Sequence, residues 1–156
     1  MNLAQAAKIV YVIEPEDHQS SGIDGDSINM SQYNHGCWIF QFGELASDSV
    51  LKMYSGASDG TKTTAETFRF RACATDLRAT GGDTLGSEST SAALTLLNAT
   101  YEDRFIVVEM DTDELTEDQY FVTPEIDSTA STLFVSCVCI LTEPRYVSDV
   151  PPAAVA

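Results

Sequence analysis

The stretch "CWIFQFGEL" at positions 37–45 decides the fold class of this chain. Side chains alternate between the two faces of a β-strand, so Trp38, Phe40 and Phe42 share one face. Smaller or more polar side chains alternate with them and occupy the other face. The stretch holds the chain's single Trp, and we expect its aromatic face to line the core of a β-protein.

The same period-two alternation recurs along the chain and predicts further strands. It is clearest at residues 65–75, "AETFRFRACAT", where Phe68 and Phe70 share one face and Arg69 and Arg71 share the other. The other predicted strands are residues 8–13, 36–42, 49–54, 89–97, 104–111, 119–126 and 131–142. A short helix is the alternative at residues 89–97. The last run is apolar on both faces, so we expect it to lie centrally, either covered on both sides or packed against a neighbour.

The connections between these runs are rich in Gly, Ser and Asp, which is typical of turns. About eight short strands without a long amphipathic helix predict an all-β fold, a jelly-roll-like β-sandwich or a small barrel, and we expect the sandwich. We divide the 156 residues into an N-terminal arm with the first strand (1–13), one sandwich domain (14–143) and a Pro-rich apolar tail (144–156). The expected core residues are Trp38, Phe40, Phe42, Phe68, Phe70, Val107, Phe134 and Val138.

The two ends of the chain are expected to be extended arms that contact other subunits or a capsid. The C-terminal tail carries no charge after Asp149, and a soluble monomer gains nothing by exposing such an apolar segment. Extended arms can add a strand to a neighbour's sheet edge. A frayed terminus is the alternative. The candidate contact residues are Leu3, Ile9, Tyr11, Arg145, Tyr146, Val150, Pro151 and Pro152.

The net charge excludes several classes of partner. The chain has 24 acidic residues, 8 basic residues and a formal net charge of −16. This charge repels nucleic-acid phosphates and anionic membrane surfaces. The sequence also contains neither the roughly 18 consecutive apolar residues of a membrane span nor the pattern of a signal peptide. We therefore predict that nucleic acid and membranes are not partners.

One sequence motif is found in enzymes, but its surroundings are wrong for catalysis. "GASDG" at residues 56–60 matches the nucleophile-elbow pattern, with Ser58 as the nucleophile. An elbow needs a helix directly after it and a His further along the chain, whereas a strand is predicted next and both His18 and His35 precede it. A thiol–imidazole pair of His35 and Cys37 is conceivable, but no third residue orients it. We predict that the protein is not an enzyme.

The candidate metal ligands follow no known spacing. The four cysteines, Cys37, Cys73, Cys137 and Cys139, include no Cys-x-x-Cys pair, so we expect buried reduced thiols that act as small apolar side chains. Two acidic clusters, at residues 24–29 and 111–118, leave a calcium site open, although neither follows the EF-hand template. Solvated turns are the simpler interpretation, and we predict no cofactor.

Four phrases in the sequence resemble a known group of proteins: "GIDGDSINMSQYNHGCWIFQFGEL", "TFRFRACATD", "FIVVEMDTDEL" and "CILTEPRY". They are similar to small virion proteins of tailed bacteriophages that are typically encoded among head genes beside the major capsid protein. The similarity extends from about residue 22 to the C-terminus, and no functional residue can be transferred from it. The resemblance implies a protein that decorates capsids as a trimer, at local three-fold positions, and cements neighbouring capsomers.

We therefore predict a capsid decoration or cement protein that binds the major capsid protein and itself, as a homotrimer. Its negative charge suits the capsid exterior because the charge would repel packaged DNA, and reduced thiols suit assembly in the host bacterial cytoplasm. A neck, tail or head-fibre component is the alternative of the same class. A carbohydrate-binding β-sandwich is the alternative of another class. The aromatic residues that such a module could expose are Tyr33, Trp38, Tyr54, Tyr101 and Tyr120.

Overall fold

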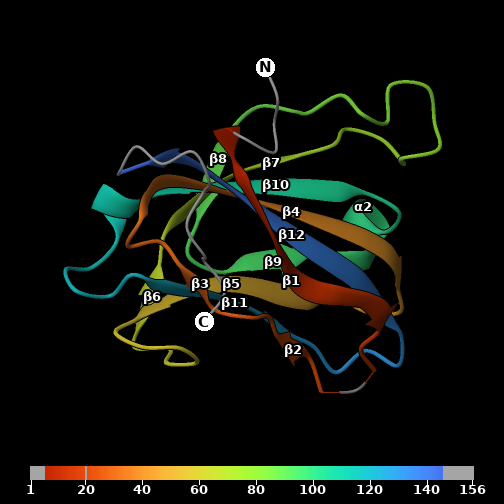
Figure 1. The fold of residues 1–156 in the computed structure, drawn as a ribbon. Helices are drawn as coiled ribbons and strands as arrows, with labels where there is room; N and C mark the ends of the chain where they lie inside the picture. Colours follow the sequence, from red (N-terminus) through yellow and green to blue (C-terminus); the bar gives the residue numbers. More distant parts are fainter. Residues whose placement is uncertain (1–5, 20, 146–156) are drawn as a thin grey trace.

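A computed structural model describes residues 6–19 and 21–145, which form two antiparallel six-stranded sheets packed as a sandwich (Figure 1). The first sheet has the order β1 (Lys8–Asp17), β12 (Leu133–Pro144), β4 (Tyr33–Leu45), β10 (Phe105–Asp111), β7 (Phe68–Ala72) and β8 (Ser89–Ser91). The second has the order β2 (Ile23–Asp24), β11 (Phe121–Asp127), β5 (Ser49–Gly56) and β6 (Thr64–Glu66), with β3 (Ile28–Asn29) paired to β11 and β9 (Leu94–Leu96) paired to β5. One short helix, α2 (Asn98–Tyr101), and the 3-10 turn η1 (Thr112–Glu114) flank β10 along the chain.

The described residues contain twelve strands, so the prediction of about eight was too low. Two predicted runs are each divided between the sheets: residues 65–75 hold β6 and β7, and residues 89–97 hold β8 and β9. Alternation continues on both sides of each break, so a period-two pattern does not reveal where the chain changes sheet. The remaining two strands, β2 and β3, have two residues each and are too short to show a period. The other six predicted runs all overlap a strand.

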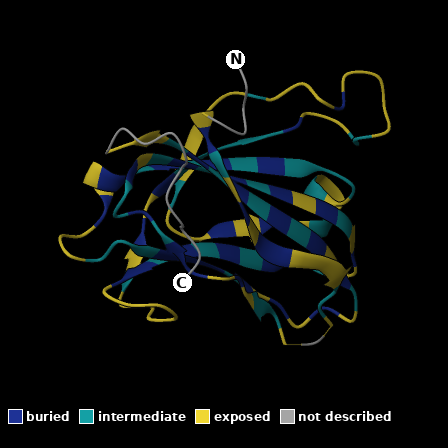
Figure 2. Ribbon diagram, viewed as in Figure 1, coloured by how far each residue is buried: buried dark blue, intermediate teal, exposed yellow. Residues whose placement is uncertain are grey.

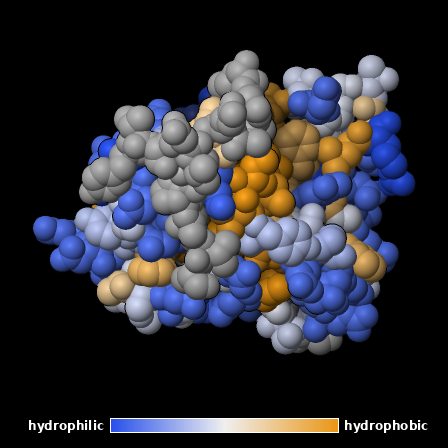
Figure 3. Space-filling model, in the orientation of Figure 1, coloured by the Kyte–Doolittle hydropathy of each residue, from blue (hydrophilic) through white to orange (hydrophobic). Residues whose placement is uncertain are grey.

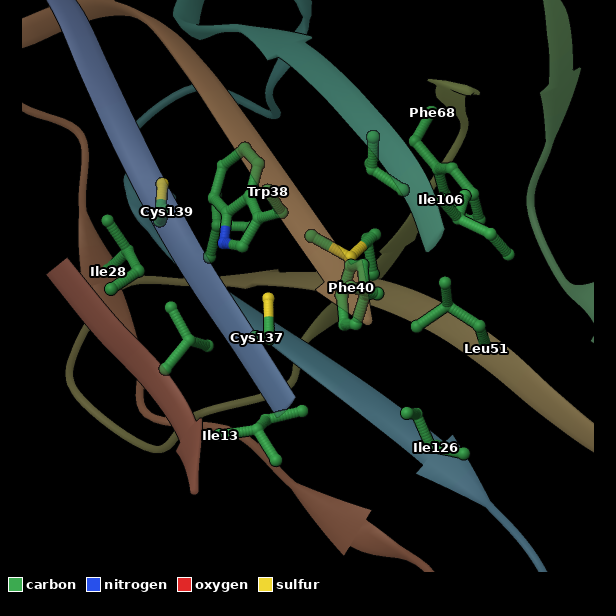
Figure 4. Close-up of a cluster of buried hydrophobic side chains, with 14 of the residues drawn as sticks. Ile13, Ile28, Trp38, Phe40, Leu51, Phe68, Ile106, Ile126, Cys137 and Cys139 are labelled. Atoms are coloured by element: carbon green, nitrogen blue, oxygen red, sulfur yellow. The ribbon is translucent and has the colours of Figure 1, made fainter. Parts of the chain in front are cut away.

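The core lies between the sheets and is built around the aromatic face of β4. Trp38 and Phe40 are completely buried, and the rings of Phe40 and Phe42 stack with their centroids 6.4 Å apart. Cys137 and Cys139 point from β12 into the same cluster (Figure 4). Along β4 and β12, buried residues alternate with half-buried ones, as expected for strands that have one side in the core (Figure 2).

Three of the expected core residues lie on the opposite side of the first sheet. Phe134 is 44% exposed, and Val107 and Val138 are half-buried. β12 and the first half of β10 are apolar on both faces, so the alternation alone could not indicate which face is buried. Phe68 is buried as expected, and Phe70 is partly buried against the core, with its ring centroid 6.2 Å from that of Phe68.

The N-terminal residues that the structure describes belong to the domain rather than to a free arm. β1 pairs with β12 from Lys8 to Asp17 and forms one edge of the first sheet. Its side chains Ile9 and Tyr11 are 54% and 49% exposed. Of the other predicted contact residues, Leu3, Tyr146, Val150, Pro151 and Pro152 lie outside the described residues, as does the tail beyond Arg145.

Candidate interaction surface

The solvent side of the first sheet carries two apolar rows that run across its strands. In one row Ile9 of β1 lies beside Ile140 of β12, which lies beside Cys37 of β4. The next row begins with Tyr11 and continues through Val138, Ile39 and Val107. With Phe105, which pairs with Gln41, these side chains form a surface that we call the outer face. Its apolar members are Ile9, Tyr11, Cys37, Ile39, Phe105, Val107, Val138 and Ile140.

The outer face is apolar because three adjacent strands carry apolar residues on both sides. In β12, for example, Cys137 and Cys139 point to the core while Val138 and Ile140 point outward. The space-filling view shows an apolar area, bordered by hydrophilic side chains, in the region where Figure 1 places β12 and β4 (Figure 3). Within the described residues no third layer packs over this side of the sheet. An apolar area of this kind on a soluble protein is typical of an interaction site.

A charged network borders the outer face where β4 and β10 meet. Nδ1 of His35 lies 2.6 Å from Oδ1 of Asp111, and Nε2 of His35 lies 3.6 Å from a carboxylate oxygen of Glu109. The guanidinium of Arg69 reaches Asp111 at 2.8 Å and Glu114 at 2.6 Å. Partial burial alone would raise the pKa of Asp111, but the hydrogen bonds from His35 and Arg69 outweigh this effect and hold the pKa below its ordinary value. The network holds three carboxylates around one guanidinium and one imidazole, so these pairings compensate its negative charge only in part.

A shallow open depression of about 380 Å³ lies at the opposite end of the outer face. Its lining includes Phe134, Gly43, Leu77 and Arg78. A Cβ atom at Gly43 would lie 3.1 Å from Cβ of Phe134, so the glycine leaves room for this exposed aromatic side chain. Arg78 donates to Asp103 at 2.6 Å and is therefore already paired. The depression thus combines apolar residues with charged ones, which are Glu16, Asp76, Arg78 and Asp103.

The suspected nucleophile elbow is an ordinary turn. Ser58 lies between β5 and β6, and its backbone N–H donates to Oγ1 of Thr61 at 3.1 Å. A strand follows the turn, where an elbow would need a helix. The two His side chains are bound elsewhere: Nε2 of His18 lies 3.0 Å from the carbonyl oxygen of Glu14, and His35 lies in the network described above.

The conceivable thiol–imidazole pair has the wrong electrostatics for a nucleophile. His35 and Cys37 are both on the outer side of β4. Burial, with a further contribution from the nearby carboxylate of Glu109, raises the pKa of the Cys37 thiol to about 11. Such a thiol remains protonated near neutral pH, whereas reactive cysteines have lowered pKa values.

All four cysteines are free. Cys73, Cys137 and Cys139 are buried as expected, but Cys37 is only half-buried because it belongs to the outer face. Residues 6–19 and 21–145 contain no group of three or more side chains that could hold a metal ion. In the first acidic cluster, Asp24 is instead paired with Lys62, whose Nζ lies 2.8 Å from its carboxylate.

The aromatic residues suggested for carbohydrate binding do not form an exposed platform. Tyr33 and Trp38 are buried, and Tyr54, Tyr101 and Tyr120 are half-buried. The contact residues predicted from the sequence do not include Cys37, Ile39, Phe105 or Ile140 of the outer face. The available signal was the two-sided apolar pattern of residues 131–142, which predicted a covered or packed strand without indicating what covers it.

Comparison of the chain with models of known protein families finds no match, and comparison with curated proteins finds no relative. No helix in the described part of the chain is long and apolar enough to span a membrane. The surface, the charge and the topology of this chain, together with its resemblance to phage virion proteins, therefore carry the functional conclusion.

Proposed function

We propose that this protein is a non-enzymatic structural component of a tailed-phage virion, a decoration or cement protein on the capsid exterior. The observation that carries the proposal is the outer face, an apolar surface across β1, β12, β4 and β10 on a chain with a net charge of −16. Such a surface is suited to binding another protein segment. Three of the groups that could serve catalysis, Ser58, His18 and His35, are engaged in local structural contacts, and the Cys37 thiol has a raised pKa.

The strand pairings support a jelly-roll assignment. The chain forms one long hairpin whose tip is the turn after β5. Its four antiparallel pairings are β1 with β12, β2 and β3 with β11, β4 with β10, and β5 with β6. The hairpin is rolled so that β12 also pairs with β4 and β11 also pairs with β5. A jelly roll is a double sheet of eight such strands, and β7, β8 and β9 are additions between β6 and β10.

Jelly rolls occur in viral capsid proteins and in lectins, so the topology is compatible with a virion role by analogy of fold. The lectin alternative is disfavoured by the burial of Trp38 and Tyr33. The charge favours the capsid exterior, because packaged DNA would repel the protein from the lumen. The proposed mechanism is binding: the protein occupies the major capsid lattice and, as a homotrimer, links neighbouring capsomers through several simultaneous contacts.

Co-sedimentation of the purified protein with capsids that lack it tests the proposal. We expect saturable binding at a fixed ratio to the major capsid protein. The matched control is the same protein incubated with free DNA, to which we expect no binding. Formation of rings or tubes without capsid binding would move the assignment to the neck or tail. Binding to a glycan array without capsid binding would favour the carbohydrate-binding alternative.

A further inference from the structure

We propose that the outer face of one copy binds the C-terminal segment, residues 146–156, of a neighbouring copy, and that this contact joins the copies into an oligomer. The inference deepens the proposed function, since it rests on a role in assembly and names the contact that mediates self-association. It depends on the composition and length of the segment, on the place where the described chain ends, and on the charge of the whole molecule.

The segment has the composition that the outer face requires. Its eleven residues, "YVSDVPPAAVA", include one charged side chain, Asp149, among mostly apolar ones. Fully extended, eleven residues span about 36 Å. The outward positions of β12 from Phe134 to Thr142 cover about 26 Å at the rise of a β-strand. One segment is therefore long enough to cross the outer face completely. Pro151 and Pro152 favour an extended conformation and so reduce the entropy lost on binding.

The described chain ends at Arg145, which several contacts hold in a fixed position at the end of β12. The backbone N–H of Arg145 donates to the carbonyl oxygen of Gln32 at 2.9 Å, and its Nε donates to Oδ1 of Asn34 at 3.1 Å. Its guanidinium carbon lies 5.6 Å from the ring centroid of Tyr120, which directly precedes β11 of the second sheet. The end of β12 is thus held at the end of the sandwich, where Arg145 lines a depression with Asp111 at the border of the outer face. The segment therefore begins beside this border, and the complementation experiment below tests whether it binds the face of a second copy.

Charge restricts which surfaces two copies can bring together. Each copy has a net charge of −16, so most approaches are repulsive. The apolar rows of the outer face contain no charged side chain between Tyr11 and Val107, and the segment carries one. At the border, Arg69 pairs with both Asp111 and Glu114, and Glu109 lies beside Cys37 at the end of one row, so the negative charge is confined to the edge of the face. Contact between this face and this segment therefore brings few like charges together.

A complementation experiment with the purified full-length chain tests this contact. One variant is truncated after Arg145, so it keeps the outer face and loses the segment. The second, Ile9→Ser with Tyr11→Ser, keeps the segment and changes two side chains of the face that are 54% and 49% exposed. Leu97→Ser is the matched control, because Leu97 is 45% exposed and lies outside the first sheet. Far-ultraviolet circular dichroism verifies the fold of each variant.

Mass measured by light scattering at matched concentrations is the readout. We expect the full chain and Leu97→Ser to be oligomers with a mass that is a multiple of 16.9 kDa. Each of the other two variants alone should be monomeric, with self-association weakened at least about tenfold, and their mixture should form a one-to-one complex. A monomeric full chain, an oligomer that survives the truncation, or a mixture that remains monomeric would each overturn the proposal. Capsid binding is measured separately. Normal self-association without capsid binding would therefore contradict the proposed function and leave this contact intact.

Discussion

Replacing one Phe on each side of the first sheet tests the register of the fold. Phe40 of β4 is completely buried, so Phe40→Ala removes a ring from the core and leaves a cavity, at a cost of about 3–5 kcal/mol in the free energy of unfolding. Phe134 of β12 is 44% exposed, and its removal leaves no closed cavity. Complete burial of a Phe side chain contributes about 1.5–3 kcal/mol, so the partial burial of Phe134 predicts a loss of about 1 kcal/mol.

Urea denaturation followed by the fluorescence of Trp38 measures both losses, since Trp38 is the only Trp and is fully buried. With a denaturant slope of about 2 kcal/mol per molar, Phe40→Ala should lower the midpoint by about 1.5–2.5 M and Phe134→Ala by about 0.5 M. The slope should not change. Equal shifts, or a larger shift for Phe134→Ala, would refute the register, because a slip of one residue exchanges the two faces of a strand.

Three further predictions concern single polar groups. Cys37 should react with iodoacetamide at pH 8 much more slowly than a free thiol, as measured by mass spectrometry, because its pKa is raised to about 11; rapid reaction in the folded protein would contradict this. The lowered pKa of Asp111 means that its network stabilises the protein above the unfolded pKa of about 3.9, and that this contribution is lost as the pH falls through the folded pKa. Asp111→Asn should thus lower stability at pH 7 by about 0.2–1 kcal/mol and flatten the acid side of the stability profile, and an unchanged profile would exclude the network. Lys62→Met breaks the ion pairs with Asp24 and Glu125 and should lower the free energy of unfolding, measured in urea, by less than about 1 kcal/mol. This loss should shrink in 1 M salt, and a loss that does not depend on salt would contradict an ionic origin.

The sequence was sufficient to predict the two-layer β architecture and the core face of β4. In β4, aromatic side chains alternate with smaller or more polar ones, so Trp38, Phe40 and Phe42 could be placed together without a structure. In β12 both faces are apolar, and the larger side chain, Phe134, was wrongly assigned to the core. The smaller Cys137 and Cys139 are buried there instead. Side-chain size is thus a poor guide to orientation where alternation is absent.

The number of strands and the outer face could not be predicted because both depend on pairing between distant segments. The change of sheet between β6 and β7 occurs within one apparently continuous alternating run. The apolar rows exist only because β1, β12, β4 and β10 are adjacent, although β1 and β12 lie near opposite ends of the chain. Local periodicity identifies the face of each strand, whereas the neighbours of that strand are set by topology.

The most direct test of the central claim is an electron cryo-microscopy map of capsids that lack this protein, after incubation with a saturating amount of the purified chain. The account predicts added density on the outside of the shell, at a fixed ratio to the major capsid protein and at local three-fold positions, into which the two-sheet sandwich fits. Density in the lumen, density confined to the neck or tail, or a map unchanged by the added protein would contradict it.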